Sequence, residues 1–220
     1  MSALAGEAVG SAYRRDALLF AQQQTWCAVQ AIGERVAPGV RESELRRIAS
    51  EVLASLGAER RWHPDIIRIG ANTCLTWKQK ATADAVLGDD DICFVDLGAV
   101  WRGHEGDAGA SFVVGNDATK RACAEACLSL WQTVAQVWRE HRPSGRELYA
   151  FAQREATAMG WALNHDIKGH RVGDFPHAIH RAPALGALGH APSDALWILE
   201  IQIRHPTLPF GAFHEDLLAD

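Results

Sequence analysis

The spacing of apolar residues over the first third of the chain is that of two amphipathic helices. From Tyr13 to Val36, apolar side chains recur every three or four positions, and the pair Pro38-Gly39 interrupts the run. A second run from Glu42 to Leu56 carries Leu, Ile and Val on one face and stops at Gly57. The pattern therefore predicts two consecutive helices.

The period changes in the middle of the chain, and the same order of elements then returns. Strands are predicted where short apolar or β-branched runs are bounded by Gly, Asp and Asn, at 66–69, 92–100 and 110–114. Asn116 or Asp117 caps a predicted helix up to about 141, and Ser144 with Glu147 forms a capping box for another up to about 160. Further strands are predicted at 161–163, 195–203 and 211–218.

The order helix, helix, strands, then again helix, helix, strands suggests an internal duplication, although no repeated sequence accompanies it. No low-complexity linker divides the halves, and a chain of this length can bury a sizeable core without disulfides or metals. We therefore expect residues 1–220 to form a single domain. Its predicted class is α/β, or α+β, with helices packed on a sheet.

The composition of the chain limits which binding partners and which cellular compartment are expected. Basic residues number 22 and acidic residues 27, and the scattered basic positions form no electrostatic footprint for nucleic acid. No apolar run is long enough to span a membrane, and the first ten residues lack the features of a signal peptide. The five cysteines include no C-x-x-C pair, which favours reduced thiols. We expect a cytoplasmic protein that binds neither nucleic acid nor membrane, with a homodimer left open.

Four acidic residues interrupt the predicted strands. Asp96 lies within the apolar run 92–98, and Asp107 follows eleven residues later, where a hairpin would bring the two carboxylates together. Glu200 and Glu215 lie in apolar surroundings of the same kind near the C-terminus. Because a desolvated carboxylate is costly unless it is paired or binds a metal, the four positions need positive partners.

A glycine-bracketed histidine lies between the two pairs of acids, at His170 in Gly169-His170-Arg171-Val172-Gly173, with His177 and His180 after it. Each residue alone also fits a structural role: Asp96 as a turn acid, Glu200 as an edge-strand charge, His170 as a loop histidine. Together, four acids and one imidazole form an oxygen-rich donor set for two divalent cations. Two such cations share a water and lower its pKa enough to make a nucleophile at neutral pH.

The order of these residues resembles the pita-bread metallopeptidase family, which includes methionine aminopeptidase, aminopeptidase P, prolidase and creatinase. The resemblance extends from about Asn72 to Asp216. The segments that carry it are Val95-Asp96-Leu97-Gly98, Gly106-Asp107, the loop from Gly169 to Gly173 with His177, and Gly211-Ala212-Phe213-His214-Glu215-Asp216. It implies a pseudo-symmetric antiparallel sheet flanked by helices, without the N-terminal domain that precedes this fold in several members.

The resemblance also implies a dinuclear metal site and the residues that form it. By position, Asp96 is a terminal bidentate ligand, Asp107 and Glu215 bridge the metals, and His170 and Glu200 complete the set. The oxygen-rich set favours manganese, with cobalt, zinc or iron as alternatives. A hydroxide bridging the metals would attack the scissile carbonyl of a short peptide.

Two residues acquire catalytic roles from the same resemblance. Glu200 would carry the proton from the attacking water to the leaving amine, a general-base role. His177 would stand outside the metals and donate to the developing oxyanion. The acidic residue that usually follows this second histidine is replaced here by Ala178.

The predicted substrate contacts depart from the usual pattern. Trp77 stands in place of a contact histidine, and Phe213 in place of the arginine of the closing segment, which predicts an apolar wall. Arg171 and Arg204 are candidate anchors for a substrate carboxylate, because a guanidinium binds it bidentately, and His180 is a further candidate donor.

The short separation of Glu200 from Glu215 resembles the proline-peptidase branch, which implies a short peptide substrate with proline beside the scissile bond. Two alternatives stay open. One is hydrolysis of a small non-peptide C–N bond, as in creatinase. The other is a binding protein that uses the same scaffold with altered catalysis.

Overall fold

A single eight-stranded antiparallel sheet organises the chain, and the computed structural model describes residues 6–220. The helices are α1 (Arg15–Gly33), α2 (Glu42–Ser55), α3 (Ala118–His141) and α4 (Gly145–Ala158), with short 3-10 turns η1 (Gly70–Cys74), η2 (His177–His180) and η3 (Leu185–Ala187). The strands are β1 (Arg60–Arg61), β2 (Ile66–Ile69), β3 (Asp91–Trp101), β4 (His104–Val114), β5 (Ala162–Leu163), β6 (His170–Arg171), β7 (Trp197–Arg204) and β8 (Gly211–Leu217).

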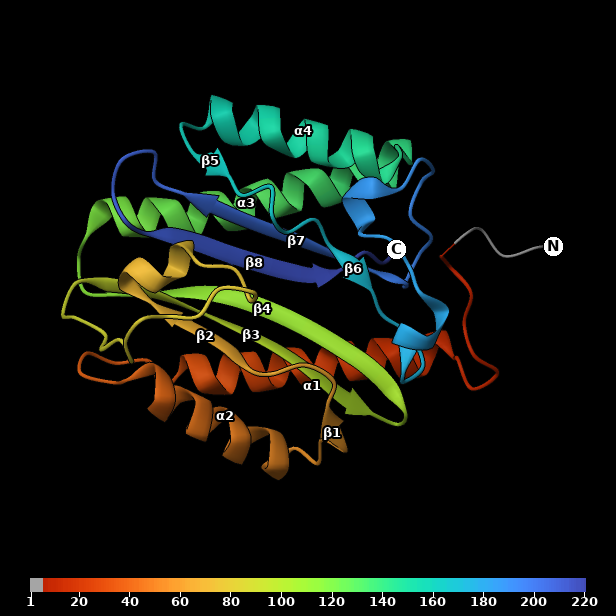
Figure 1. The fold of residues 1–220 in the computed structure, drawn as a ribbon, viewed down its shortest axis with the longest axis horizontal. Helices are drawn as coiled ribbons and strands as arrows, with labels where there is room; N and C mark the ends of the chain where they lie inside the picture. The colour runs from red at the N-terminus through yellow and green to blue at the C-terminus, as the bar shows by residue number, and fades with distance from the viewer. Residues whose placement is uncertain (1–5) are drawn as a thin grey trace.

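Two long hairpins meet at the centre of the sheet. The strand order is β1-β3-β4-β8-β7-β5, with β2 also paired to β3 and β6 to β7. Hairpin β3–β4 comes from the first half of the chain and β7–β8 from the second, and Gly109 pairs with Glu215 where they join. Helices α1 and α2 lie along the first hairpin and α3 and α4 along the second (Figure 1). The predicted pseudo-symmetric sheet flanked by helices is confirmed.

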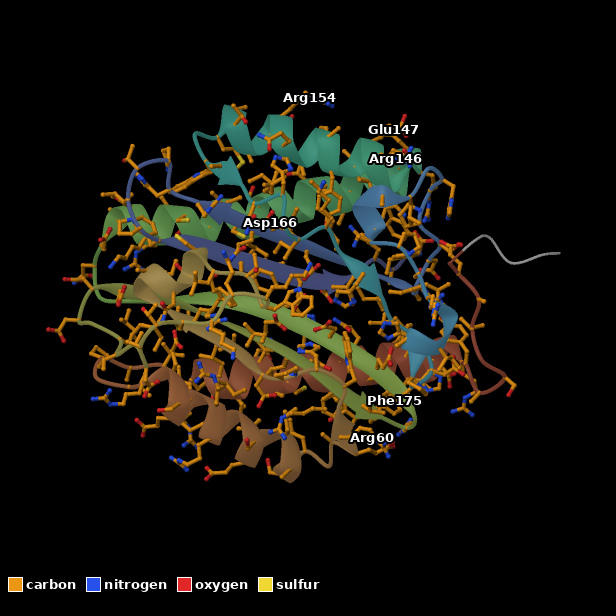
Figure 2. All side chains as sticks on the ribbon, in the orientation of Figure 1. Arg60, Arg146, Glu147, Arg154, Asp166 and Phe175 are labelled. Carbon is orange, nitrogen blue, oxygen red and sulfur yellow. The ribbon has the colours of Figure 1, made fainter. Side chains whose placement is uncertain are left out.

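The helices of the second half begin where their capping residues predict. Asp117 accepts hydrogen bonds from the backbone N–H groups of Thr119 and Lys120 at the start of α3. Ser144 and Glu147 form the complete capping box of α4, with Glu147 at the exposed start of that helix (Figure 2). Among residues 6–220, no helix is both long and apolar enough to cross a membrane.

Each half of the sheet has its own apolar core. Val29, Ile32 and Leu45 of α1 and α2 pack against β2 and β3, and all three are fully buried. In the other half, the indole N–H groups of Trp131 and Trp138 donate to the carbonyls of Leu199 and Pro192, at 2.8 and 2.9 Å. These hydrogen bonds let two large side chains be buried without leaving a polar atom unpaired.

Strand β4 is longer than its apolar pattern indicates. The predicted strand covered 110–114, whereas β4 begins at His104 and pairs with β3 over eleven residues. Residues 104–109 carry glycine, acids and histidine in place of alternating apolar side chains. Backbone pairing with β3 makes this segment a strand, and its side chains build a polar site.

Candidate metal centre

The four acids of the sequence motif gather where the two hairpins join. Asp96 lies on β3 and Asp107 on the adjacent β4, while Glu200 on β7 is directly opposite Glu215 on β8. Gly109 of β4 pairs with Glu215 and thereby brings the two pairs of acids together. All four carboxylates line one cavity.

The crowding of buried carboxylates changes their pKa values. Burial raises the pKa of Asp96 to about 7, although the nearby His63 opposes the change. Burial and the other carboxylates also raise the pKa of Glu200 and of Glu215. Asp107 is the exception: the imidazoles of His63 and His170 outweigh its burial and lower its pKa to about 2. Positive charge placed among these carboxylates therefore stabilises their ionised forms.

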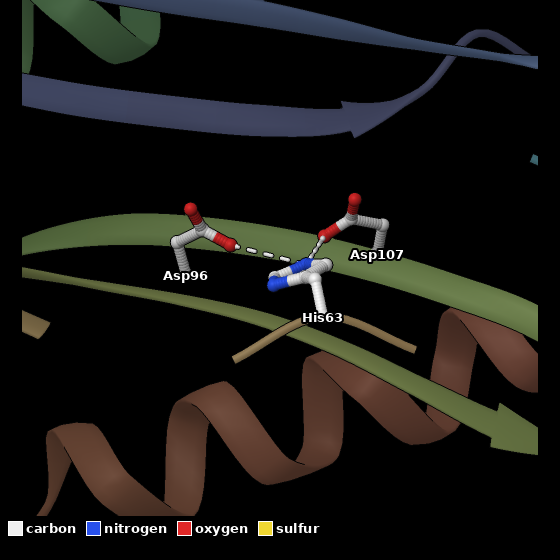
Figure 3. A group of neighbouring side chains, drawn as sticks. All are labelled: His63, Asp96 and Asp107. Carbon is white, nitrogen blue, oxygen red and sulfur yellow. Dashed lines mark hydrogen bonds and ion pairs between the residues drawn. The ribbon is translucent and has the colours of Figure 1, made fainter. Parts of the chain in front are cut away.

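Two imidazoles face Asp107 from opposite sides. Nε2 of His170 lies 2.9 Å from Oδ2 of Asp107, and Nε2 of His63 lies 3.3 Å from Oδ1. Figure 3 shows the carboxylates of Asp96 and Asp107 both pointing at the His63 ring. Burial works to lower the pKa of both histidines, but the neighbouring carboxylates raise it to about 10 for His63 and about 9 for His170.

The donor atoms fit a pair of cations that share Asp107. Atoms of His63, Asp96 and Asp107 lie within 4.8 Å of one another, and so do atoms of Asp107, His170 and Glu215. Three buried oxygens of this cluster accept no hydrogen bond from the described residues, namely Asp96 Oδ1, Asp107 Oδ2 and Glu215 Oε1. Because unpaired buried carboxylate oxygens are costly, these residues suit divalent cations.

Glu200 occupies a different place beside this group. Its Oε2 accepts a hydrogen bond from the backbone N–H of Gly169 at 2.8 Å, which ties β7 to the histidine loop. Glu200 belongs to neither of the two donor groups, although it lines the same cavity. This position leaves one carboxylate oxygen for a cation or for a proton.

His177 is held away from the donor groups by Glu105. Its Nδ1 lies 2.5 Å from Oε2 of Glu105, and its backbone N–H donates to Oε1 of the same carboxylate at 3.0 Å. Glu105 also accepts a hydrogen bond from the backbone N–H of Gly173 at 3.1 Å. This one buried acid therefore holds both Gly173 and His177 of the histidine loop. Within residues 6–220 as described, Glu105 engages Nδ1 of the His177 ring, and no hydrogen bond to its Nε2 is found.

Glu105 and His63 were not predicted from the sequence. Glu105 pairs with Nδ1 of His177, and the available signal for it was its position two residues before Asp107 on one strand. His63 precedes β2, which pairs with β3 next to Asp96. That pairing is visible only once the strands are in register.

The acids lie in a cavity of about 620 Å³. Trp62 packs edge-on against His63, His170 and His177, with ring centroids 4.5, 5.3 and 5.3 Å away. The side chains that line the cavity besides the imidazoles and acids include the apolar Pro64, Ile66, Trp77, Ile167 and Pro183 and the cationic Lys78, Lys168 and Arg181. The lining of the cavity therefore combines apolar side chains, buried acids and four cationic side chains, since Arg171 also borders it.

The predicted substrate contacts are divided by the structure. Trp77 and Arg171 both line the cavity, but Trp77 is 62% exposed whereas Arg171 is buried and donates from Nη1 to the carbonyl of Gly6 at 2.6 Å. Phe213 is buried against Phe94 and lines only a small recess beside the cavity. Arg204 is an exposed residue at the end of β7 and is not among the described residues of the cavity wall. The side chain of His180 lies outside the described part of the structure.

The raised pKa values predict how stability depends on pH when cations are removed by a chelator. In the folded chain the pKa of Asp96 rises from 3.8 to about 7, and that of His63 from 6.5 to about 10. A group that binds its proton more tightly when folded stabilises the protein below its unfolded pKa and loses this effect as the pH rises through its folded pKa. We expect a lower thermal midpoint at pH 9 than at pH 5.

The control for that measurement is the same protein with saturating divalent cation. Because cations replace the protons in the cluster, the thermal midpoint should then depend less on pH. An equal or higher midpoint at pH 9 in chelator would contradict the charge distribution described here.

Comparisons with known proteins place this fold and site in a class. The model of metallopeptidase family M24 matches residues 17–216, and the chain belongs to that family. The methionine aminopeptidase of Clostridium perfringens is 25% identical over 194 residues, which cover 85% of this chain and 76% of that protein.

Solved structures share the fold at lower identity. The prolidase of Pyrococcus furiosus matches with a TM-score of 0.74 and 23% identity, over 93% of this chain and 60% of the prolidase. The methionine aminopeptidase of Thermotoga maritima matches with a TM-score of 0.74 and 15% identity, over 93% of this chain and 92% of that one. The chain thus spans less than two thirds of the prolidase and most of the aminopeptidase.

Proposed function

We propose that this chain is a dinuclear metal-dependent peptidase that hydrolyses short peptides beside a proline. The observation that carries the proposal is that one cavity is lined by Asp96, Asp107, His170, Glu200 and Glu215 together with apolar side chains. Family membership supports metal-dependent peptidase chemistry, and the cavity supports a small substrate.

The five residues would hold two divalent cations, with Asp107 shared between them. Bound cations would supply Lewis acidity and a water that is nucleophilic at neutral pH. Glu200, which lines the cavity outside both donor groups, would pass the proton of the attacking water to the leaving nitrogen. His177 would donate from Nε2 to the oxygen of the scissile carbonyl while Glu105 holds its other nitrogen.

The walls and the rim of the cavity favour a dipeptide with a compact ring. Trp62, Pro64 and Ile66 offer an apolar surface that fits a pyrrolidine ring. Lys78, Lys168 and Arg181 line the same cavity and would lie against the terminal carboxylate. Arg171 also lines the cavity, but its Nη1 is bonded to the carbonyl of Gly6, and Arg204 is not among the lining residues, so these three cations are the proposed anchors.

A second candidate is removal of an N-terminal methionine. The relative from Clostridium perfringens, which matches 85% of this chain, is a methionine aminopeptidase, and the same apolar walls would accept a thioether side chain. The two candidates differ in what stands beside the scissile bond: a proline ring in one, a methionine in the other.

A peptide panel with protein loaded with Mn²⁺ tests both candidates. The panel contains Xaa-Pro dipeptides, their C-terminal amides, tripeptides that begin with Met-Ala, and other proline-free peptides. Hydrolysis is followed by mass spectrometry. We expect the Xaa-Pro acids to be cleaved fastest, and their amides to show a higher KM because they lack the carboxylate. Faster cleavage of the Met-Ala peptides would favour the second candidate, and no cleavage of any peptide would remove both.

A further inference from the structure

His63 lies where a metal ligand would lie. Its Nε2 is 3.3 Å from Oδ1 of Asp107 and 3.5 Å from Oδ1 of Asp96, so one nitrogen faces oxygens of two acids (Figure 3). The Asp96 oxygen accepts no hydrogen bond. An imidazole and two carboxylates that converge on one point form a donor set for a divalent cation.

The hydrogen bond made by the other nitrogen of the His63 ring also fits a metal ligand. Its Nδ1 lies 2.8 Å from the carbonyl oxygen of Pro64, and a carbonyl can only accept a hydrogen bond. Nδ1 of the neutral ring therefore carries the proton, and the lone pair is on Nε2, which faces the acids. Histidines that ligate metals are oriented in this way by a backbone carbonyl.

His170 has the same arrangement on the other side of Asp107. Its Nδ1 lies 3.0 Å from the carbonyl oxygen of Arg171, and its Nε2 lies 2.9 Å from Oδ2 of Asp107 without forming an aligned hydrogen bond. Each carboxylate oxygen of Asp107 thus faces the Nε2 of one imidazole. His177 differs, because its Nδ1 is paired with Glu105.

The surrounding residues leave room for the His63 ring in this position. A Cβ added at Gly98, which pairs with Asp107, would lie 2.1 Å from Cδ2 of His63. Trp62 packs edge-on against the same ring and is itself held by a hydrogen bond from its Nε1 to the carbonyl of Gly106, at 3.2 Å. Gly98 thus leaves space for the imidazole next to Asp107, and the indole of Trp62 packs against it.

We infer that His63 is an additional metal ligand that joins Asp96 and Asp107 around one cation, while His170 serves the other cation from the opposite side of Asp107. This inference rests on the proposed dinuclear centre and changes its donor set. Each cation then has one imidazole. Since imidazole suits zinc, cobalt and iron better than manganese, the second histidine shifts the preference of the centre toward those metals.

Proton NMR of the Co²⁺-loaded protein tests the assignment. A histidine bound through Nε2 places its Nδ1 proton close to paramagnetic cobalt, and this proton gives a shifted signal that disappears in D₂O. We expect two such signals in the wild-type protein. His63→Asn should remove one of them, and His170→Asn should remove the other.

Metal stoichiometry separates failure of this inference from failure of the dinuclear centre. We expect two equivalents of cobalt in the wild type, and in His63→Asn a loss of affinity at one site by about 10²-fold or more. His177→Ala is the matched control, a cavity imidazole that should leave both sites intact. Two equivalents with one exchangeable signal that His63→Asn retains would overturn the inference alone. A wild type that binds no metal would overturn the centre as well.

Discussion

Replacing Asp107 with alanine is expected to remove metal and peptidase activity together. Asp107 belongs to both donor groups and faces an imidazole with each of its oxygens. Its loss removes one negative charge from each cation site, so neither site keeps a complete set of ligands. Metal analysis of the dialysed variant should return less than one equivalent, and activity should fall to that of metal-free protein.

Two further variants control this experiment. Asp107→Asn keeps the volume of the side chain and should lose metal in the same way, which separates the charge from packing. Asp166 also lines the cavity but belongs to neither donor group, so Asp166→Asn should retain both equivalents. If Asp107→Ala still bound two equivalents, the assignment of Asp107 as a shared ligand would be wrong.

Replacing His177 with alanine is expected to lower kcat by about 10²–10³-fold while both cations stay bound, the effect of losing one donor to a developing oxyanion. The reason lies in its contacts: Nδ1 is engaged by Glu105 at 2.5 Å, and the ring lines the cavity with no hydrogen bond from Nε2 to the described residues. Since the donation strengthens in the transition state, kcat should change more than KM. Steady-state kinetics combined with metal analysis checks both parts.

Glu105 provides the matched variant for this prediction. Glu105→Gln keeps the shape of the side chain but weakens its hydrogen bond to Nδ1 of His177. This variant should reduce kcat less than His177→Ala does. In the double variant the Glu105 substitution should have little further effect, because its partner is absent. Loss of metal from His177→Ala would instead place His177 among the ligands.

The sequence by itself carried the order of elements and the family motif. The helices over 15–33, 42–55, 118–141 and 145–158 follow from apolar spacing and local caps, which act over a few residues. Asp96, Glu200 and Glu215 stand out because an acid within an apolar strand contradicts its surroundings. Such contradictions can be read without knowing which strands pair.

Only the tertiary structure decided how the site is completed. His63 reaches the acids because β2 pairs with β3, and Glu105 reaches His177 because the histidine loop folds over β4. The same packing buries the guanidinium of Arg171 at the cavity and bonds it to the carbonyl of Gly6, a contact that the sequence does not indicate. Apolar periodicity specifies which face of a strand is buried. Contacts between residues 44 to 165 positions apart depend instead on strand register and loop packing, which no local pattern encodes.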